Sequence, residues 1–512
     1  MIFIGTAGHH VGSPNARYLV IGEYEKPDPR ELAPVPFDGT GGVTIVDLDA
    51  SNSVVHIDLP TPVLGVAFGS DGQSLVVTRT PTGTDPKSPP AANVYLLDPG
   101  SGILQLLGAS DPALRATDLP VDPTAPPRFP PQIIQAAAGV SSDRNVVYVL
   151  AATDPDAAAS SHRVALLRYD VPSHTFTTQK FESNPSFGPR SVSVDPTGEF
   201  VLASWGLLRN ISNKYHVWAE FPSPDGAFNL GSHAWDSSRN LIYAQIPAPG
   251  DHSVLHVVDT DNLTVRERIQ MQEDLAGKSI ISSDSNVMYS VSVSGVTVLP
   301  IGQLPQTPRV GATQEDLLFT SDACANLGLQ QVVNIVSLGS ARADFRLSLP
   351  TGVTGISLSR TSGTTPAQVV VTIDPAAFQD RTGTTAVPLA ISSAGAVNLP
   401  SPVRLLINTR DFNQRGQIFD VPGKIVDMLS DPTRNRLYLL RQDKNQLLVY
   451  ETANPPRLIN TLRTGNTPMH MAMTVDKKYM IVGNDHSQIA NVYDLEGVRQ
   501  IGPILFPLGH YP

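Results

Sequence analysis

Four cationic or ionisable side chains share one kind of position in this sequence, shortly after a Gly or Pro phrase and at the start of an apolar run. They are Arg190, Lys278, Lys424 and His470. If the apolar runs are strands that gather around one axis, these groups would meet at a single mouth and would suit an anionic ligand. The alternative is that they point into solvent as ordinary loop residues.

Histidine pairs are the next candidates for chemistry, and they give little support to a metal site. His9 and His10 are adjacent before a turn, whereas His252 and His256 are four residues apart. On a strand, four residues span about 13 Å, so His252 and His256 cannot coordinate the same metal ion. We therefore expect neither a metal nor a cofactor.

Motifs of catalysis are missing from the sequence. The phosphate-binding loop, the Gly-x-Ser-x-Gly elbow, the dinucleotide fingerprint and zinc-type Cys/His spacing are all absent. The single cysteine, Cys324, stands in no context that would activate a nucleophile. A hydrolase would need convergent acid–base or metal-binding groups, and no such set recurs clearly enough to name a catalytic residue.

The elements that would position these side chains form a repeated phrase. Each unit reads as an apolar run, a turn built on Asp or Asn, a second apolar run and a third run that ends in Asp. The turn residues are Asn15, Asp71, Asp143, Asp195, Asp236, Asp284, Asp431 and Asp476, which lie 41 to 72 residues apart except for one interval of 147. A period of about 40 to 45 residues with four short strands per unit is the signature of a propeller.

These units resemble the YVTN-type β-propeller repeats of bacterial surface proteins, which are relatives of the lactonase-like propellers. The resemblance rests on Gly465-Asn466-Thr467-Pro468, on residues 472–484 and on Asn491-Val492-Tyr493-Asp494. It is specific for the fold and implies a scaffold. A lactonase-like hydrolase with its site at the propeller channel, or a purely structural segment of a larger surface protein, are the alternatives.

Residues 305–411 interrupt the repeat. Alternating runs at 345–349, 368–373 and 403–407, separated by Gly, Pro and Ser turns, predict a small β-sandwich. Residues 359–375 resemble the Ig-like domains called BACON, which occur in bacterial secreted and surface proteins. The resemblance implies a spacer or docking module.

The predicted fold is therefore all-β, a propeller of about seven or eight four-stranded blades with an inserted Ig-like β-sandwich. Residues 1–304 would hold about six blades, residues 305–411 the sandwich and residues 412–512 two further blades. Because two blades alone would leave exposed sheet edges and little core, we favour one ring built from both sets. Two separate propellers are the alternative.

Composition limits the partners. The 512 residues carry a formal net charge of −11 without a Lys/Arg-rich run, which argues against a nucleic-acid partner. No apolar run reaches the about 18 to 20 residues of a membrane helix. We expect a non-enzymatic protein that binds a protein or a glycan through propeller loops, as a monomer or as part of a longer chain.

The location is predicted from resemblance alone. Both families named above belong to bacterial secreted or surface proteins, which implies an extracytoplasmic protein. The N-terminal residues 1–10 have no basic start and too short an apolar stretch for a signal peptide. The export signal would therefore lie outside this chain.

Overall fold

The protein is almost entirely β-structure, as predicted. The computed structural model describes residues 9–15, 17–22, 41–51, 53–79, 94–107, 133, 135–152, 164–181, 191–221, 231–245, 253–292, 294–322, 329–379, 383–410, 413, 415–507 and 510–512. Within these ranges, the chain forms eight small antiparallel sheets of consecutive strands and two further sheets that face each other.

Six of the small sheets follow one another from the N-terminus. The first consists of β1 (His9–Gly12), β2 (Tyr18–Gly22), β3 (Gly41–Asp47) and β4 (Ser53–Leu59). The second consists of β5 (Val63–Phe68), β6 (Ser74–Thr78), β7 (Val94–Asp98) and β8 (Ile103–Leu106). The third consists of β9 (Gln135–Val140), β10 (Val146–Ala152), β11 (Val164–Asp170) and β12 (Thr175–Phe181).

The next three sheets repeat this order. The fourth consists of β13 (Val192–Val194), β14 (Phe200–Ala203), β15 (Gly206–Ile211) and β16 (Lys214–Glu220). The fifth consists of β17 (Ser232–Asp236), β18 (Leu241–Gln245), β19 (Val254–Asp259) and β20 (Val265–Gln270). The sixth has three strands in the described part of the chain, β21 (Leu275–Ile281), β22 (Met288–Ser292) and β23 (Val296–Leu299).

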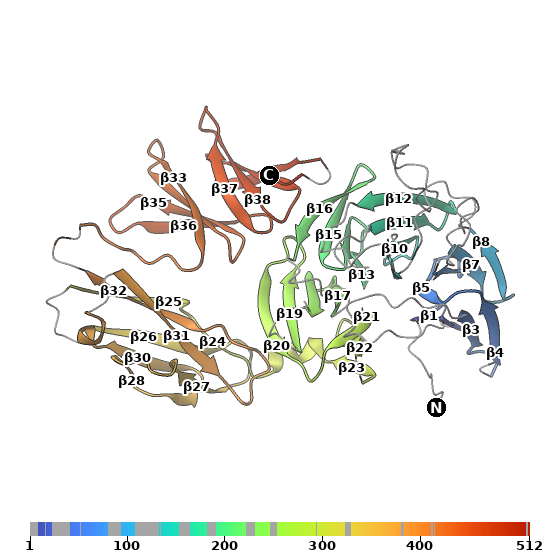
Figure 1. Cartoon of the computed structure of the whole chain (residues 1–512), viewed down its shortest axis with the longest axis horizontal. Helices are drawn as coiled ribbons and strands as arrows, with labels where there is room; N and C mark the ends of the chain where they lie inside the picture. The colour runs from blue at the N-terminus through green and yellow to red at the C-terminus, as the bar shows by residue number, and fades with distance from the viewer. Residues whose placement is uncertain are drawn as a thin grey trace, which may run out of the picture.

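These six sheets stand around a common centre like the blades of a propeller, and we call them the ring (Figure 1). The first strand of each sheet is innermost and contacts the first strand of the next, from β1 through β5, β9, β13 and β17 to β21. Small residues permit this approach. A Cβ atom on Gly139 in β9 would stand 2.8 Å from the backbone oxygen of Val192, so a side chain there would push the third and fourth sheets apart.

All eight turn residues of the repeat have the same role. The side-chain oxygen of each accepts a hydrogen bond from the backbone N–H two residues further on, at 3.0 to 3.3 Å, which closes the hairpin between the first and second strands of its sheet. The residues are Asn15, Asp71, Asp143, Asp195, Asp236, Asp284, Asp431 and Asp476. The predicted turn positions are confirmed.

The two sheets that face each other lie between residues 310 and 410, and we call them the sandwich. One has the strand order β24 (Val310–Ala312), β26 (Leu329–Ser337), β30 (Ala367–Ile373) and β28 (Ile356–Leu358). The other has the order β25 (Asp316–Asp322), β32 (Val403–Arg410), β31 (Gly383–Ser392), β27 (Asp344–Ser348) and β29 (Ser362–Thr364). One apolar core that includes Phe319, Phe345 and Val371 fills the space between them. The 3₁₀ turn η3 (Ile301–Gln306) precedes these strands, and the 3₁₀ turn η4 (Pro375–Phe378) lies between β30 and β31 in the sequence.

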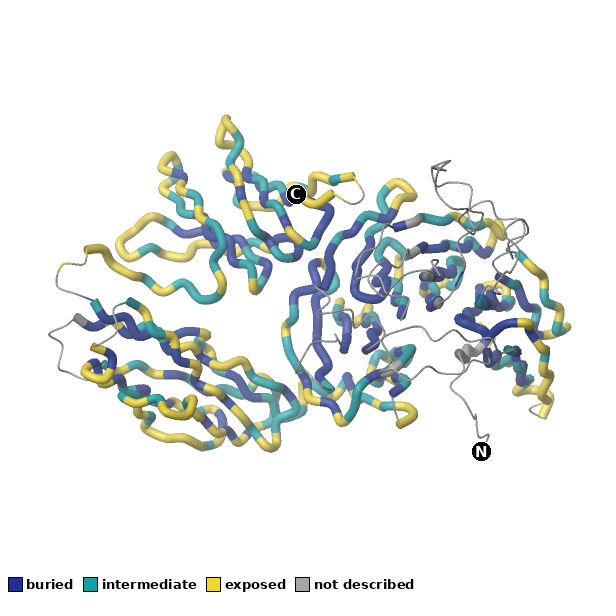
Figure 2. Tube along the Cα trace, viewed as in Figure 1, coloured by how far each residue is buried: buried dark blue, intermediate teal, exposed yellow. Residues whose placement is uncertain are grey.

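The last two small sheets form a separate unit, which we call the C-terminal pair. One consists of β33 (Ile425–Asp431), β34 (Arg436–Arg441), β35 (Gln446–Glu451) and β36 (Arg457–Arg463). The other consists of β37 (Pro468–Met473), β38 (Tyr479–Asn484), β39 (Ile489–Asp494) and β40 (Arg499–Leu505). Their facing sides share a core that includes Tyr438, Met480 and Tyr493, whereas the outer strands β36 and β40 are largely exposed (Figure 2).

The preference for a single ring was wrong, although blade-like sheets are present in the predicted number. The C-terminal pair packs against the outside of the fourth and fifth sheets instead of joining the innermost strands (Figure 1). The physical reason is that a turn of the fifth sheet binds buried polar groups of the pair, since Asn262 forms hydrogen bonds with Thr464, Asn445 and Asn466.

Candidate functional site

Lys278 lies on the innermost strand of the sixth sheet, at a break in the strand register. Leu275 pairs with Ser292 and Ser279 pairs with Ser290, so four steps along β21 match only two along β22. The residues between form a bulge, a device that re-aims a side chain away from the regular alternation. The bulge explains how a lysine can stand on a strand that otherwise packs tightly.

The surroundings of Lys278 differ from those of a surface lysine. The residue is half-buried, and burial together with the positive charge of Arg144 lowers the pKa of its ammonium group to about 8. Arg144 comes from the turn between β9 and β10 of the third sheet. Among the described residues, no carboxylate forms an ion pair with Lys278. Two positive charges from different sheets therefore act on the same region inside the ring.

Lys424 and His470 belong to the C-terminal pair and not to the ring. Both are exposed, and both adjoin a register break at the start of an innermost strand, in β33 and β37 respectively. The Lys424 Nζ donates to Gln442 Oε1 at 2.6 Å, and the Gln442 amide donates to the carbonyl of Pro468 at 3.3 Å. The structure thus brings these two predicted positions near each other.

The expected mouth with all four groups is not assembled, because the pair does not share the axis of the ring. Lys278 belongs to the ring, whereas Lys424 and His470 belong to the C-terminal pair. Arg190 lies outside the described residues. Three of the four positions share a local feature: Lys278 lies within a register break in the first strand of its sheet, and Lys424 and His470 adjoin such a break.

A buried belt of hydroxyl groups and one histidine joins the innermost strands beside Lys278. The Ser279 Oγ lies 2.7 Å from Ser232 Oγ and 2.6 Å from Ser290 Oγ, and the His233 Nδ1 lies 2.8 Å from Ser193 Oγ. His233 is 1% exposed, and burial lowers its pKa to about 3, so its imidazole is neutral at physiological pH. Sequence reasoning missed this belt, because its members belong to different repeats.

The remaining candidates for metal or nucleophilic chemistry do not assemble a site. His256 is buried in β19, whereas His252 and Cys324 lie outside the described residues. Within the part of the chain that the structure describes, no group of three or more His, Cys, Asp or Glu side chains could hold a metal ion. The same described residues contain no helix long and apolar enough to cross a membrane.

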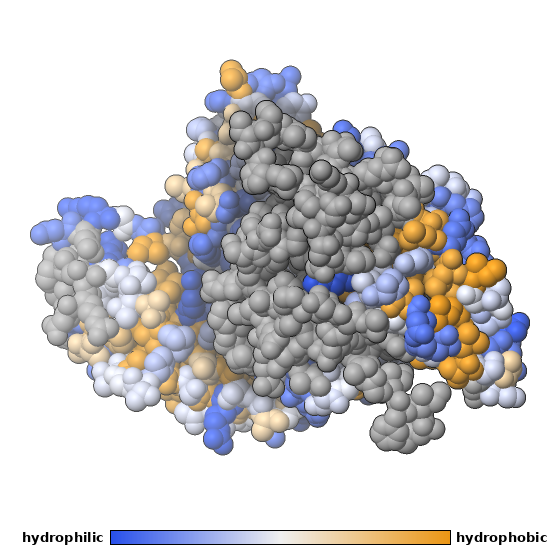
Figure 3. All heavy atoms as spheres, turned by 45° about the vertical axis from the view of Figure 1, so that its right-hand side comes forward, coloured by the Kyte–Doolittle hydropathy of each residue, from blue (hydrophilic) through white to orange (hydrophobic). Residues whose placement is uncertain are grey.

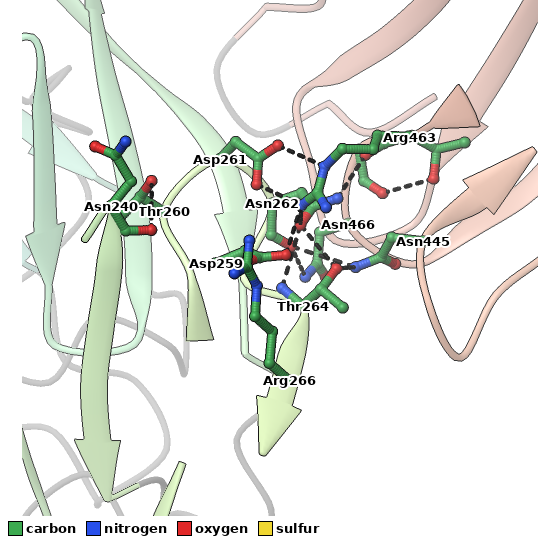
Figure 4. A network of polar contacts seen from close by, with 12 residues as sticks. Asn240, Asp259, Thr260, Asp261, Asn262, Thr264, Arg266, Asn445, Arg463 and Asn466 are labelled. Atoms are coloured by element: carbon green, nitrogen blue, oxygen red, sulfur yellow. Dashed lines mark hydrogen bonds and ion pairs between the residues drawn. The ribbon is translucent and has the colours of Figure 1, made fainter. Parts of the chain in front are cut away.

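The most extensive polar network lies where the fifth sheet meets the C-terminal pair (Figure 4). The turn between β19 and β20 carries Asn262, whose Nδ2 donates to the carbonyl of Thr464 at 2.9 Å. The backbone carbonyl of Asn262 accepts from Asn466 Nδ2 at 2.8 Å and from Asn445 Nδ2 at 3.3 Å. Both asparagines belong to the pair, so side chains of the pair bind the backbone of this turn through hydrogen bonds.

Arg463 completes this network. Its guanidinium group lies 2.7 Å from a carboxylate oxygen of Asp259 and 2.6 Å from one of Asp261, and it donates to Asn262 Oδ1 at 2.9 Å. Burial alone would lower the pKa of Arg463, but the hydrogen bonds and charges of the two aspartates raise this pKa. A guanidinium group that bridges two carboxylates fixes both position and orientation.

Two further junctions hold the sandwich. Backbone hydrogen bonds join its segment 397–399 to β20, from Gln270 N to Val397 O at 3.0 Å and from Leu399 N to Arg268 O at 2.8 Å. On its other side, Glu315 forms an ion pair with Arg441 of the C-terminal pair. Ring, sandwich and pair are therefore each bound to the other two.

Comparisons with known proteins add no function to this geometry. No family model matches the chain, and no curated protein matches it. Among solved structures, it is similar to the dihydro-heme d1 dehydrogenase NirN in complex with DHE, at 10% identity and a TM-score of 0.25, over 81% of this chain and 71% of that one.

A second solved structure is regucalcin from Agrobacterium tumefaciens, a calcium-binding protein. The likeness has 14% identity and a TM-score of 0.31, over 53% of this chain and 81% of that one. Neither likeness supports an argument about ligands or chemistry, and the fold described above rests on the strand order and the contacts of the innermost strands.

Proposed function

We propose that this protein is a non-enzymatic binding scaffold that works outside the cytoplasm and recognises an anionic protein or glycan at the inside of its ring. The observation that carries the proposal is Lys278, a half-buried ammonium group on a bulge of an innermost strand with no described carboxylate partner. A cation held in this way within a chain of net charge −11 is suited to an anionic ligand.

The acidic residues of the repeat support a scaffold. All seven aspartates at the hairpin turns accept backbone hydrogen bonds, and Asp284 illustrates the consequence. Hydrogen bonds from Ser282 and Asn286 lower the pKa of Asp284 to about 2, so it stays ionised in its turn and is poorly suited to general acid–base catalysis. The three mutual junctions of ring, sandwich and pair further favour a body that presents fixed surfaces.

The location outside the cytoplasm is proposed from the resemblance to YVTN-type and BACON-like repeats of bacterial surface proteins. It is tested by fractionating cells that express the native gene. Recovery of the protein in the cytoplasmic fraction alone would remove this part of the proposal.

Substitution of Lys278 tests the binding site. On an array of sulfated and uronic-acid glycans and acidic peptides, Lys278→Ala is expected to weaken binding at least about tenfold, because the ligand's charge loses its partner. Lys278→Arg keeps the charge and should retain most of the binding. Lys214→Ala, an exposed lysine on β16 of the same ring, is the matched control and should bind as the wild type does.

Binding should also depend on pH in a defined direction. Because the pKa of Lys278 is lowered to about 8, its ammonium group is charged below this pH and neutral above it. The affinity for an anionic glycan should therefore be constant near pH 7 and fall between pH 8 and pH 10, by up to about tenfold per pH unit. Calorimetric titration of wild type and Lys278→Arg measures this, and the variant should lose affinity only at higher pH.

Two results would overturn the proposal. One is equal binding by wild type and Lys278→Ala to every anionic ligand that the wild type binds. The other is turnover of a panel of lactones by the wild type that Lys278→Ala abolishes, since that outcome would assign the site to a hydrolase.

A further inference from the structure

Three half-buried aromatic residues gather where the fourth sheet meets the fifth. Phe200 of β14 and Trp218 of β16 belong to the fourth sheet, and Trp235 of β17 belongs to the fifth. The ring centroid of Phe200 lies 6.1 Å from that of Trp218, edge to face, and 6.4 Å from that of Trp235 at an interplanar angle of 28°. We call these three residues the aromatic platform. Each keeps part of its surface accessible, whereas Trp205 in the same core is 1% exposed.

A bulge in the outer strand of the fourth sheet brings Trp218 to the platform. Leu207 pairs with Ala219, and Leu208 pairs with Val217. Trp218 is therefore an extra residue of β16. In a regular strand, neighbours in the sequence point to opposite faces, but Trp218 and Ala219 both pack on the core shared with the fifth sheet. Bulges re-aim side chains in this way and are frequent next to functional sites.

Arg209 and Glu199 form a charged rim beside the platform. The guanidinium carbon of Arg209 lies 4.5 Å from the ring centroid of Trp218 and 5.3 Å from that of Phe200. The same group forms an ion pair with Glu199 at 2.6 Å, and the two side chains are 32% and 42% exposed. An arginine that is both stacked and paired keeps a fixed position, and its five N–H donors exceed what one carboxylate uses.

The indole nitrogen of Trp218 leads to a second ion pair. This Nε1 donates to the backbone carbonyl of Asp261 at 2.9 Å. The Asp261 carboxylate lies 2.6 Å from the guanidinium group of Arg463, which belongs to the C-terminal pair (Figure 4). The Asp261 and Arg463 side chains are 56% and 48% exposed. The platform therefore adjoins two accessible ion pairs whose formal charges sum to zero.

We infer that the aromatic platform and these two ion pairs form a binding site for a neutral glycan. A sugar ring has faces made largely of C–H groups and a rim of hydroxyl groups. The C–H faces pack on aromatic rings, and each hydroxyl can donate to a carboxylate and accept from a guanidinium group. Because two arginines balance two carboxylates, the site offers no net charge to an anion. It is a second site, outside the ring, and does not use Lys278.

Titration of the full chain with neutral oligosaccharides tests the inference. The panel consists of hexasaccharides of glucose, mannose, xylose and N-acetylglucosamine, and calorimetry measures the affinity. The wild type should bind at least one of them and change its tryptophan fluorescence. Trp218→Ala should weaken this binding at least about tenfold, because the sugar loses its apolar contact. Glu199→Ala should weaken it at least about threefold, because the hydroxyl groups lose an acceptor.

Two control variants and the salt concentration identify the site. Tyr289→Ala removes an exposed aromatic residue of the sixth sheet, and Val54→Ala shortens an exposed side chain of β4, on the side of the ring that Figure 3 brings forward. Both should bind as the wild type does. Because a neutral sugar has no charge to be screened, the affinity should change less than about twofold between about 0.1 M and about 1 M sodium chloride.

Three results would overturn the inference. The first is a wild type that binds no saccharide of the panel. The second is a Glu199→Ala variant that binds as tightly as the wild type, and this variant is decisive if Trp218→Ala also loosens the C-terminal pair. The third is an affinity that falls steeply with salt, since that would assign the binding to charge.

Discussion

Replacement of Asn262 by alanine is expected to release the C-terminal pair from the ring. The substitution removes the hydrogen bond to the carbonyl of Thr464 and the one from Arg463, and it leaves buried polar groups without partners on both sides of the junction. Buried groups left unpaired in this way cost about 1 to 3 kcal/mol each, so the docking free energy should fall by about 2 to 4 kcal/mol.

The release should appear as a separate unfolding transition. In the wild type, we expect residues 425–505 to unfold together with the ring, whereas in Asn262→Ala they should exchange amide hydrogens faster and unfold at a lower temperature. Asn210→Ala is the matched control, because Asn210 lies in the ring and its Oδ1 has no hydrogen-bond partner. Exchange rates in residues 425–505 that are the same in Asn262→Ala and the wild type would refute the role of this turn.

Acidification is expected to destabilise the ring through His233 well before its carboxylates are protonated. The pKa of His233 is lowered to about 3 in the folded protein, against about 6.5 in the unfolded chain. Between these values the unfolded state binds the proton more readily, so the stabilisation present above pH 6.5 is lost as the pH falls. The loss is about 1.4 kcal/mol per pH unit, or about 3 kcal/mol at pH 4.5.

Two variants separate the effect of His233 protonation on stability from the effect of its hydrogen bond to Ser193. His233→Asn keeps an acceptor for Ser193 and should lower the stability at pH 7 but flatten its dependence on pH between 4.5 and 6.5. Ser193→Ala should cost about 1 kcal/mol at every pH and keep the slope, because burial is the main cause of the shift. Urea unfolding at intervals of half a pH unit measures both, and a slope in His233→Asn equal to that of the wild type would contradict the prediction.

The sequence allowed the sheets to be predicted but not their assembly into units. The turn residues could be read because each acts within its own hairpin, where Asp284 contacts Asn286 two residues away. The position of Lys278 was found for the same reason, since a Gly phrase marks the start of its strand.

The decisive contacts between units could not be found in this way. Arg463 and Asp261 are 202 residues apart, and nothing in the phrase around Asn262 distinguishes it from the other turns of the repeat. The pairing of His233 with Ser193 crosses two repeats, 40 residues apart, and involves ordinary residues of innermost strands. A repeat specifies its own hairpins strongly, whereas a contact between distant copies depends on side chains that the repeat does not fix.

The burial of Asn262 also bears on how the protein should be made. Asn262-Leu263-Thr264 is an acceptor triplet for N-linked glycosylation, which attaches a sugar to the amide nitrogen of the asparagine. In the folded protein that nitrogen donates to Thr464, and the residue is 2% exposed, so no sugar fits. A eukaryotic secretory host that modifies the chain before it folds would produce a ring that the C-terminal pair cannot dock on. Bacterial expression leaves the junction free to form.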